Sequence, residues 1–410
     1  MGFWMLDKMK GGKTREYYDQ IRYAWKEGSS VEETEKRIQN LIAHAVKTTD
    51  FYKDYPETCS LEDLPVVNKD TFRQQYDRFV SSTYKDAPDN RVMCTSGSTG
   101  TPLRMIQNRD KIRHNTAGGI FLGAAAGYYI GMKEAFIRVW VNNVRKSKFQ
   151  LLQENLIMMD SSRMDEKALE EMFHVIEKKK VKCLVGYSSA LGELSEYIRK
   201  TGRDISRWSV EMVFSMGEAL PQETYDLTKE LFGFSPVRSY GNNENGFIAI
   251  QLDEDPEYTV DLYNFYPEIL KLDSDEPAEP GELGRIVVTD YYNKTFPMVR
   301  YDTGDTGKMR VYYDKNGRVH AKYTEIYGRR GSLMYNTKGE PLSIHVFMNT
   351  LLKFEGTVYQ AKCIQWGEKD YELLVNADRS RLDETELLAA YRHYLGEDAE
   401  LRITYVDQIP

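Results

Sequence analysis

Three short runs decide the fold class: VKCLV at residues 181–185, VEMVF at 210–214 and VRSY at 237–240. Two amphipathic helical patterns lie between them, Leu191–Lys200 and Pro221–Phe232. Short apolar runs with polar flanks are typical of buried strands, and parallel strands need a helical crossover between them. The stretch therefore predicts an α/β domain whose sheet is largely parallel.

The same alternation extends toward the N-terminus. Glu134–Val141 is predicted as a strand and Asp165–Lys180 as a helix. The apolar residues of this helix share one face and are expected in the core: Leu169, Met172, Phe173 and Ile176. Residues 1–50 look helical, and Ser30 with Glu33 fits a capping box. The buried face expected after that cap consists of Ile38, Leu41, Ile42, Ala45 and Val46.

Toward the C-terminus the pattern changes to strands and turns. A domain boundary is predicted near residues 328–331. Beyond it a hairpin over 358–375, a helix from Asp383 to about Tyr394 and a strand at Leu401–Val406 form a small α+β pattern. We therefore predict an N-terminal domain of residues 1–328 and a small C-terminal domain of residues 329–410.

Composition excludes several classes of protein. The 410 residues carry 55 Lys and Arg against 63 Asp and Glu, a net charge of −8, whereas sequence-independent nucleic-acid binding needs a basic face. The most apolar stretch, Gly118–Met132, is too short to span a bilayer and is interpreted as a core helix. The four cysteines form no Cys-x-x-Cys pair and the six histidines are scattered, so structural zinc is disfavoured. The N-terminus lacks a signal-peptide pattern, and we expect a reducing cytoplasm.

The first candidate site is the segment CTSGSTGTP at 94–102, in which hydroxyl residues and glycines alternate. Glycines let successive backbone N–H groups converge on one anion, and hydroxyls add donors, as a polyphosphate requires. The segment is not a P-loop, because no lysine follows Gly100. A surface turn without function is the alternative interpretation.

Three further segments carry groups suited to a nucleotide. SYGNNENG at 239–246 follows a predicted strand and offers a tyrosine for stacking and Glu244 for a hard cation. RYDTGD at 300–305 ends in Asp305, which can accept two hydrogen bonds from a ribose diol. YGRRG at 327–331 places two guanidinium groups at the predicted boundary.

In this order the segments resemble the core motifs of the adenylate-forming superfamily, which includes acyl-CoA synthetases, luciferase and the adenylation domains of peptide synthetases. The branch that the chain most resembles is the phenylacetate–CoA ligase-like one, including adenylate-forming proteins of capsule biosynthesis. Three more segments support the resemblance: FSMGEAL at 214–220, PGELG at 280–284 and DLPVVNK at 63–69. The match runs over most of the chain.

The resemblance implies a large multi-sheet N-terminal domain, a small mobile α+β C-terminal domain and ATP bound at their junction. The residues that would cradle the β- and γ-phosphates are Thr95, Ser96, Gly97, Ser98, Thr99 and Gly100. Gly217, Glu218 and Gly241 would line the nucleotide, and Tyr240 would stack on the adenine. Asp305 would hold the ribose, with Arg329 nearby. Glu244 would bind Mg²⁺, and the predicted catalytic residues are Thr99, Glu244 and Arg329.

The pocket for the acid is specified less sharply. By analogy with the family topology, Trp140, Asn142 and Tyr187 border it. Core packing is an equally good interpretation of Trp140 and Tyr187. The asparagine favours a polar substrate over a long acyl chain.

The resemblance implies ATP-dependent activation of a small carboxylic acid as an acyl-adenylate, followed by transfer to CoA, a carrier or a sugar acceptor. A lysine in a C-terminal Ser-Gly-Lys-like loop is usual in the family, and the sequence reaches Pro410 about where that loop would begin. The alternative is therefore a catalytically impaired nucleotide-binding homologue. Lys111 and Lys338 are possible substitutes for this lysine, although both are better interpreted as solvated. The acid and the oligomeric state stay open.

Overall fold

The structure is a computed structural model that describes residues 2–94, 103–140, 146–252, 255–330, 334–342, 350, 354, 357–407 and 409. The chain divides into two compact units, Met1–Thr303 with Gly307–Glu325, and Gly304–Thr306 with Ile326–Pro410. Within the described ranges the helices are α1 (Gly2–Met9), α2 (Lys13–Glu27), α3 (Val31–Thr48), α4 (Lys69–Gln74), α5 (Tyr76–Phe79), α6 (Arg109–Ala125), α7 (Lys148–Glu154), α8 (Glu166–Lys179), α9 (Ser188–Thr201), α10 (Gln222–Phe232) and α12 (Glu384–Leu395). The strands are β1 (Arg91–Cys94), β2 (Arg104–Gln107), β3 (Glu134–Arg138), β4 (Leu156–Asp160), β5 (Cys183–Tyr187), β6 (Met212–Met216), β7 (Val237–Asn242), β8 (Gly246–Gln251), β9 (Tyr258–Val260), β10 (Phe265–Leu270), β11 (Gly284–Asp290), β12 (Tyr301–Tyr313), β13 (Val319–Arg329), β14 (Met334–Tyr335), β15 (Pro341–Leu342), β16 (Val358–Gln365), β17 (Asp370–Ala377) and β18 (Glu400–Tyr405).

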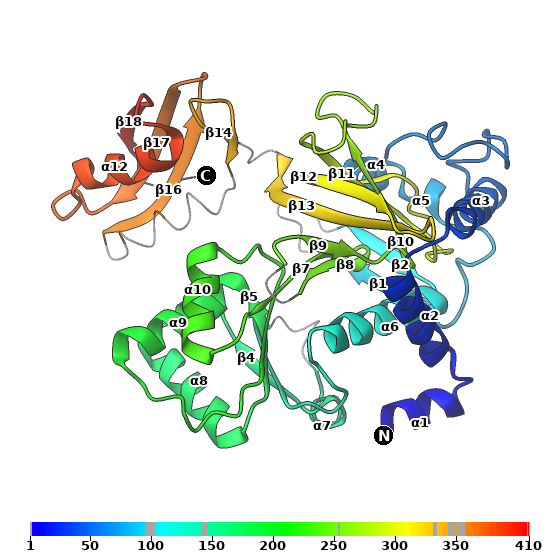
Figure 1. Cartoon of the computed structure of the whole chain (residues 1–410), viewed down its shortest axis with the longest axis horizontal. Coiled ribbons are helices and arrows are strands. Elements are labelled where there is room, and N and C mark those ends of the chain that lie inside the picture. Colours follow the sequence, from blue (N-terminus) through cyan, green and yellow to red (C-terminus); the bar gives the residue numbers. More distant parts are fainter. Residues whose placement is uncertain are drawn as a thin grey trace. The chain divides into compact units, whose positions relative to one another are not determined.

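The α/β class is confirmed by one large mixed sheet, in the strand order β10-β11-β12-β13-β9-β8-β7-β6-β5-β3-β4 (Figure 1). From β4 to β7 the neighbouring strands run parallel. From β7 onward β8 and then β9 pair antiparallel. The expectation of a largely parallel sheet is therefore right for one half only. The turn at residues 243–245 that joins β7 to β8 is too short for the crossover that a parallel neighbour needs.

Both faces of the parallel half are covered by helices. On one face α8 and α9 pack against β3, β5 and β6, and the predicted inward residues of α8 are all buried there: Leu169, Met172, Phe173 and Ile176. On the other face α2 and α6 contribute Ile21, Ala117, Phe121 and Leu122 to a separate core with β5 to β8. The helices of the first face, drawn in green in Figure 1, lie together on one side of the strands.

The N-terminal helix α3 matches its prediction closely. The Ser30 hydroxyl caps it by accepting a hydrogen bond from the Glu33 backbone N–H. All five predicted apolar residues are buried, and they pack against Phe72, Phe79 and the segment 291–301. The cap and the periodicity are both local properties, which explains why the sequence alone predicted them.

The C-terminal unit has a sheet of its own. β16 and β17 form the predicted hairpin, and β18 pairs parallel with β17. Helix α12 packs on this sheet through Leu387, Tyr391 and Leu395, which are buried. Asp383 caps α12 by accepting from the Glu386 backbone N–H.

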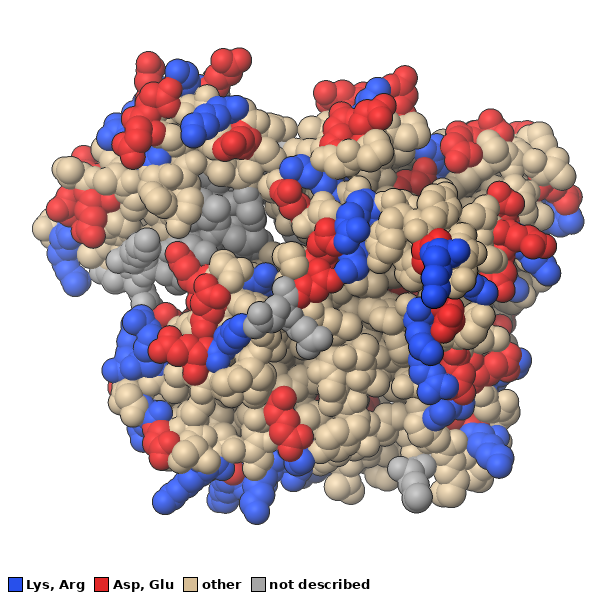
Figure 2. Space-filling model, in the orientation of Figure 1, with Lys and Arg blue, Asp and Glu red and all other residues tan. Residues whose placement is uncertain are grey.

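Surface charge and helix hydropathy agree with the composition. Acidic and basic side chains are interspersed over the face shown in Figure 2, rather than gathered by sign as a nucleic-acid surface would require. In the part of the chain that the structure describes, every helix is too short or too polar to cross a bilayer.

A buried histidine links α2 to α6. The His114 ring stacks between Tyr17 and Tyr292, with centroid distances of 3.8 and 3.5 Å. Its Nδ1 lies 2.9 Å from Asn264 Oδ1, so the neutral ring donates to the amide oxygen. Burial lowers the pKa of His114 to about 3, because charging the ring would remove its hydration.

We expect this histidine to make the fold acid-sensitive. In the unfolded chain His114 binds a proton below about pH 6.5, whereas in the folded chain it stays neutral to about pH 3, so its stabilising contribution is lost as pH falls below 6.5. Between pH 7.5 and pH 5 the loss is about 2 kcal/mol. Urea unfolding measures the free energy of unfolding at the two pH values. The fall in this free energy from pH 7.5 to pH 5 should be about 2 kcal/mol smaller in His114→Phe than in the wild type.

The exposed His393→Phe serves as the control and should keep the wild-type difference. Asp261 acts with the opposite sign, because burial raises its pKa to about 6 and the folded chain gains stability as pH falls through that value. Comparing variants cancels this second contribution. An unchanged pH difference in His114→Phe would contradict the assignment.

Candidate active site

The parallel strands end at one edge of the sheet. β3, β5 and β6 finish level with one another at Arg138, Tyr187 and Met216. β7 runs about three residues further, to Asn242, because Ser215 lies opposite Arg238. In open α/β sheets ligands bind outside the carboxyl ends of the strands, because the connecting loops converge there. Two of the predicted nucleotide segments, 217–218 and 240–244, follow or end these strands.

The turn after β6 is fixed by close packing. Gly217 has a φ of +78°, and a Cβ there would lie 2.9 Å from the Tyr187 ring. Both the backbone conformation and the Tyr187 ring therefore exclude a side chain. The Glu218 carboxylate accepts from the Ser189 backbone N–H at 3.0 Å, and the Glu218 carbonyl accepts from the Ser188 hydroxyl at 2.9 Å. The turn is thus tied to the first residues of α9.

Tyr240 and Gly241 lie at the end of β7. Tyr240 is 8% exposed, its hydroxyl donates to Thr303 Oγ1 at 3.3 Å, and its ring meets Tyr323 edge-on. A Cβ on Gly241 would lie 2.3 Å from the Gly246 carbonyl oxygen, so the tight hairpin requires glycine. The stacking role of Tyr240 stays a prediction.

Glu244 occupies the tip of that hairpin and is 1% exposed. Its Oε1 lies 2.8 Å from Lys69 Nζ and accepts a hydrogen bond from the Tyr301 hydroxyl at 3.1 Å. A buried carboxylate is tolerated only when it is paired and hydrogen-bonded, and these two partners meet that requirement.

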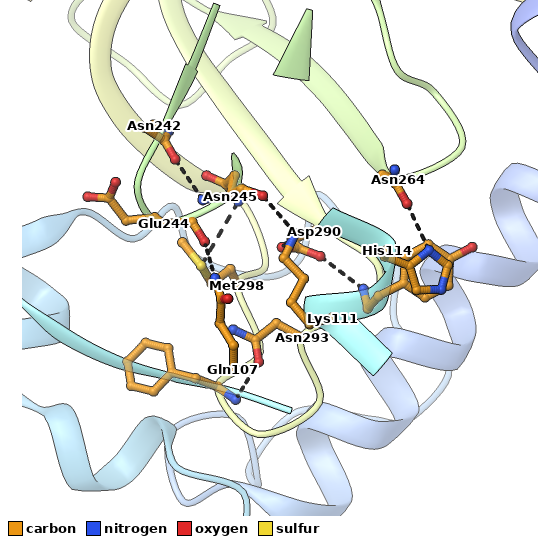
Figure 3. Close-up of polar contacts among 12 residues, drawn as sticks. Gln107, Lys111, His114, Asn242, Glu244, Asn245, Asn264, Asp290, Asn293 and Met298 are labelled. Carbon is orange, nitrogen blue, oxygen red and sulfur yellow. Dashed lines mark hydrogen bonds and ion pairs between the residues drawn. The ribbon is translucent and has the colours of Figure 1, made fainter. Parts of the chain in front are cut away.

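The turn that carries Glu244 is anchored through its backbone (Figure 3). Gln107 donates from its side chain to the Glu244 carbonyl at 3.1 Å, and Lys111 donates to the Asn245 carbonyl at 2.8 Å. The Asn245 N–H in turn donates to Asn242 Oδ1 at 2.7 Å. Two consecutive carbonyls are thus held from β2 and α6, which determines the direction of the Glu244 side chain.

Lys111 is buried, so its interpretation as a solvated lysine was wrong. Its ammonium lies 2.5 Å from Asp290 Oδ2 and 4.8 Å from the Phe265 ring centroid. Burial lowers the pKa of Lys111, while the Asp290 carboxylate favours the charged form. The burial of Lys111 was not predicted because the residues that contact it lie far away in the sequence.

The residues around Glu244 fit a magnesium ion with few protein ligands. Among the described residues no cluster of three or more His, Cys, Asp or Glu side chains could hold a metal by itself. Mg²⁺ commonly binds through one or two carboxylates and completes its shell with water and substrate phosphates. Glu244 can serve as that carboxylate through oxygen lone pairs that Lys69 and Tyr301 leave available.

In the C-terminal unit Asp305 and Arg329 come together. Arg329 Nε lies 3.5 Å from Asp305 Oδ1, and the Thr306 hydroxyl donates to the Gly328 carbonyl at 3.2 Å. Gly304 has a φ of +80°, and a Cβ there would lie 3.1 Å from Arg329 Nη1. The roles of Asp305 and Arg329 toward ATP stay predictions.

Some predicted residues lie outside the described part of the chain: Thr95, Ser96, Gly97, Ser98, Thr99, Gly100 and Asn142. The antiparallel strands β1 and β2 precede and follow the first of these segments, with Cys94 opposite Arg104. Trp140 is buried, and its Nε1 donates to the Met159 carbonyl at 2.9 Å, while Tyr187 is half-buried beside Gly217. Their role toward the acid also stays a prediction.

Several residues of this region were missed by the sequence analysis. Lys69 and Tyr301 were quoted within motif segments, but their contacts with Glu244 were not predicted. Gln107 and Arg138 carry no motif at all. A charged residue directly after the apolar middle of a strand, as Arg138 is at the carboxyl end of β3, was the available signal.

Comparison with known proteins bears on all these observations. No protein-family model matches the chain. The chain is 20% identical over 425 residues to Protein CapK of Staphylococcus aureus, covering 98% of this chain and 91% of CapK. It is 21% identical over 376 residues to the phenylacetate-coenzyme A ligase of Thermus thermophilus, covering 80% and 79%.

Solved structures agree in fold. A 2-hydroxyisobutyryl-CoA ligase in the postadenylation state, in complex with R3-HIB-AMP, has a TM-score of 0.70 at 16% identity, covering 93% of this chain and 88% of the ligase. The amide bond synthetase McbA from Marinactinospora thermotolerans has a TM-score of 0.50 at 17% identity, covering 78% and 66%. The motif order, the sheet and the relatives in sequence agree: this chain has the fold of the adenylate-forming ligases and is a distant homologue of CapK and of the phenylacetate-coenzyme A ligase.

Proposed function

We propose that the protein activates a small carboxylic acid with ATP and then transfers the acyl group to CoA or to another acceptor. In the first step a carboxylate oxygen attacks the α-phosphorus, the bond to the bridging oxygen breaks, and pyrophosphate leaves. In the second step the acceptor attacks the acyl carbon and AMP leaves, while the acceptor's proton passes to solvent.

The first step needs no general base from the protein. The attacking carboxylate is already ionised at pH 7. The barrier arises from bringing two anions together and holding them in line, so positioning and positive potential are the protein's main contributions. One observation supports the proposal above all. Glu244 is buried in a turn at the carboxyl end of β7, and Gln107 and Lys111 hold this turn through hydrogen bonds to its carbonyls.

The other roles follow from chemistry and from the resemblance. Glu244 would hold Mg²⁺, which supplies charge neutralisation at the phosphates when bound. Lys69 pairs with the Glu244 carboxylate at 2.8 Å and fixes its direction. Gly217, Glu218, Tyr240 and Gly241 would line the nucleotide, Asp305 and Arg329 the ribose, and residues 95–100 the phosphates. Trp140, Asn142 and Tyr187 would border the acid.

The biological setting is the finer part of the proposal. The similarity to CapK supports a role in decorating a polysaccharide, with a sugar or a carrier as acceptor in place of CoA. We propose the cytoplasm as the location, because the reaction consumes ATP. A catalytically impaired nucleotide-binding homologue is the competing function.

The test is acid-dependent exchange of labelled pyrophosphate into ATP, with Mg²⁺ and a panel of aryl, short-chain, hydroxy, dicarboxylic and amino acids. We expect exchange that requires one class of acid. ATP binding by calorimetry without exchange for any acid would favour the impaired homologue. Neither exchange nor ATP binding would refute the proposed function.

A further inference from the structure

A guanidinium lies among aromatic rings at the carboxyl end of β3. Arg138 is the last residue of this strand. Its Cζ lies 5.5 Å from the ring centroid of Phe136, 5.4 Å from that of Trp140 and 6.0 Å from that of Tyr187. Cations are attracted to aromatic faces at such distances, and arginine is the cation most often found there.

The rings around Arg138 are held by other contacts. Trp140 is 6% exposed, and its indole N–H is hydrogen-bonded to the Met159 carbonyl. Phe136 meets Trp140 edge-on at 5.5 Å. Tyr187 packs so closely on Gly217 that a Cβ would not fit between them. The arginine is therefore held by a preformed aromatic environment and not by a flexible surface.

The charge of Arg138 has no counter-ion in the described part of the chain. Its Nε donates a long hydrogen bond of 3.4 Å to the Val139 carbonyl, and no carboxylate among the described residues pairs with it. The buried arginines of the same unit differ: Arg285 pairs with Asp302 at 2.9 Å, and Arg300 with Glu268 at 3.1 Å. Arg138 thus keeps most of its donors for another partner.

The register places these side chains on one face of the sheet. Ala135 and Ile137 point into the core formed with α8 and α9, and both are fully buried. Phe136 and Arg138 alternate with them and point to the opposite face. Phe136 pairs with Val185 there. At the end of β5 Tyr187 pairs with Met216 and also packs against the core of α8 and α9. Phe136, Arg138, Val185, Tyr187 and Met216 are all half-buried. The Arg138 guanidinium therefore lies at a partly exposed, mainly apolar part of the carboxyl edge.

We propose that Arg138 binds a second carboxylate of the acid substrate, at the end remote from the carboxylate that is adenylated. The preferred substrates are then short dicarboxylic acids, and not the corresponding monocarboxylic acids. The planar guanidinium matches a carboxylate with two parallel hydrogen bonds, and the rings accommodate the carbon chain between the two acid groups. This inference rests on the proposed adenylation.

The test compares acids that differ only in the second carboxylate: propanoate with malonate, butanoate with succinate, and phenylacetate with 4-carboxyphenylacetate. Pyrophosphate exchange is measured for the wild type, Arg138→Met, Arg138→Lys and the control Arg207→Met. Arg207 is a largely exposed arginine that lies 3.8 Å from Glu177. A melting curve for each variant shows whether it is folded.

We expect the wild type to prefer at least one dicarboxylic acid over its partner. Arg138→Met should lower kcat/KM for that acid by about 10²-fold and leave the monocarboxylic acids within about threefold, because a site built for a polar group discriminates strongly when the pairing is lost. Arg138→Lys should retain part of the preference, because its ammonium keeps the positive charge but lacks the two parallel donors of the guanidinium. If Arg138→Met does not fold, Arg138→Lys takes its place in the test. Arg207→Met should match the wild type.

The outcomes separate this inference from the proposed function. Exchange with monocarboxylic acids only, or a dicarboxylic preference that survives in Arg138→Met, would overturn the role of Arg138 while adenylation stands. Absence of exchange with every acid would refute adenylation. In that case calorimetric titration with the same dicarboxylic acids still decides: binding that Arg138→Met abolishes supports the site, and no binding refutes it.

Discussion

Glu244→Gln is expected to lower acid-dependent pyrophosphate exchange by about 10²- to 10³-fold, the size of effect typical for the loss of one transition-state electrostatic contact. The substitution keeps the shape of the side chain and removes only its charge. The half-saturating Mg²⁺ concentration should rise at the same time, because a neutral amide is a weaker ligand for a hard cation. Exchange rates over a Mg²⁺ series measure both effects.

Glu268→Gln is the matched control. Glu268 is a largely buried carboxylate, with an 11% exposed side chain that pairs with Arg300 at 3.1 Å, but it lies on β10, away from the ends of the parallel strands. Both variants should lose some stability, because each breaks an ion pair. Only Glu244→Gln should shift the Mg²⁺ dependence. Equal Mg²⁺ dependence in the two variants, or unchanged exchange in Glu244→Gln, would refute the metal role.

Lys111→Met is expected to lower the free energy of unfolding by about 3–5 kcal/mol, the usual cost of leaving one member of a buried ion pair alone. Asp290 is fully buried, and the variant would leave its carboxylate without the ammonium at 2.5 Å. Chemical unfolding measured by circular dichroism reports this loss. A loss below about 1 kcal/mol would contradict the pairing.

The double variant Lys111→Met with Asp290→Leu separates packing from positioning. Replacing a buried ion pair by apolar residues of similar volume is often neutral or stabilising, so most of the lost stability should return. Exchange activity should not return, because Lys111 also donates to the Asn245 carbonyl and no apolar residue replaces that hydrogen bond. Recovery of both stability and exchange would show that Lys111 does not position the Glu244 turn.

Local features of the fold were predictable from the sequence. The cap of α3 by Ser30 and the buried faces of α3 and α8 agree with the prediction residue by residue. The hairpin of β16 and β17 and the helix after Asp383 also agree. Each depends on residues within a few positions of one another, and such short-range preferences act in any tertiary context.

Features that depend on long-range pairing were predicted less well. The sheet was expected to be largely parallel, and the antiparallel half from β8 onward was not foreseen. Lys111 was interpreted as solvated, because a lysine in a polar helical segment usually is. Its actual environment comes from Asp290 and from Asn245, which is 134 positions away.

By itself the sequence determined the α/β class, the succession of helices and strands, and the ordered motifs that identify the superfamily, because these are carried by periodicity and by residues adjacent in the chain. Only the tertiary structure decided which side chains meet at the carboxyl edge: the pairing of Lys69 with Glu244, the two anchors of the Glu244 turn, and the aromatic rings around Arg138. The physical reason is that burial and charge pairing join segments far apart in the sequence, and their energies depend on the neighbours that folding supplies.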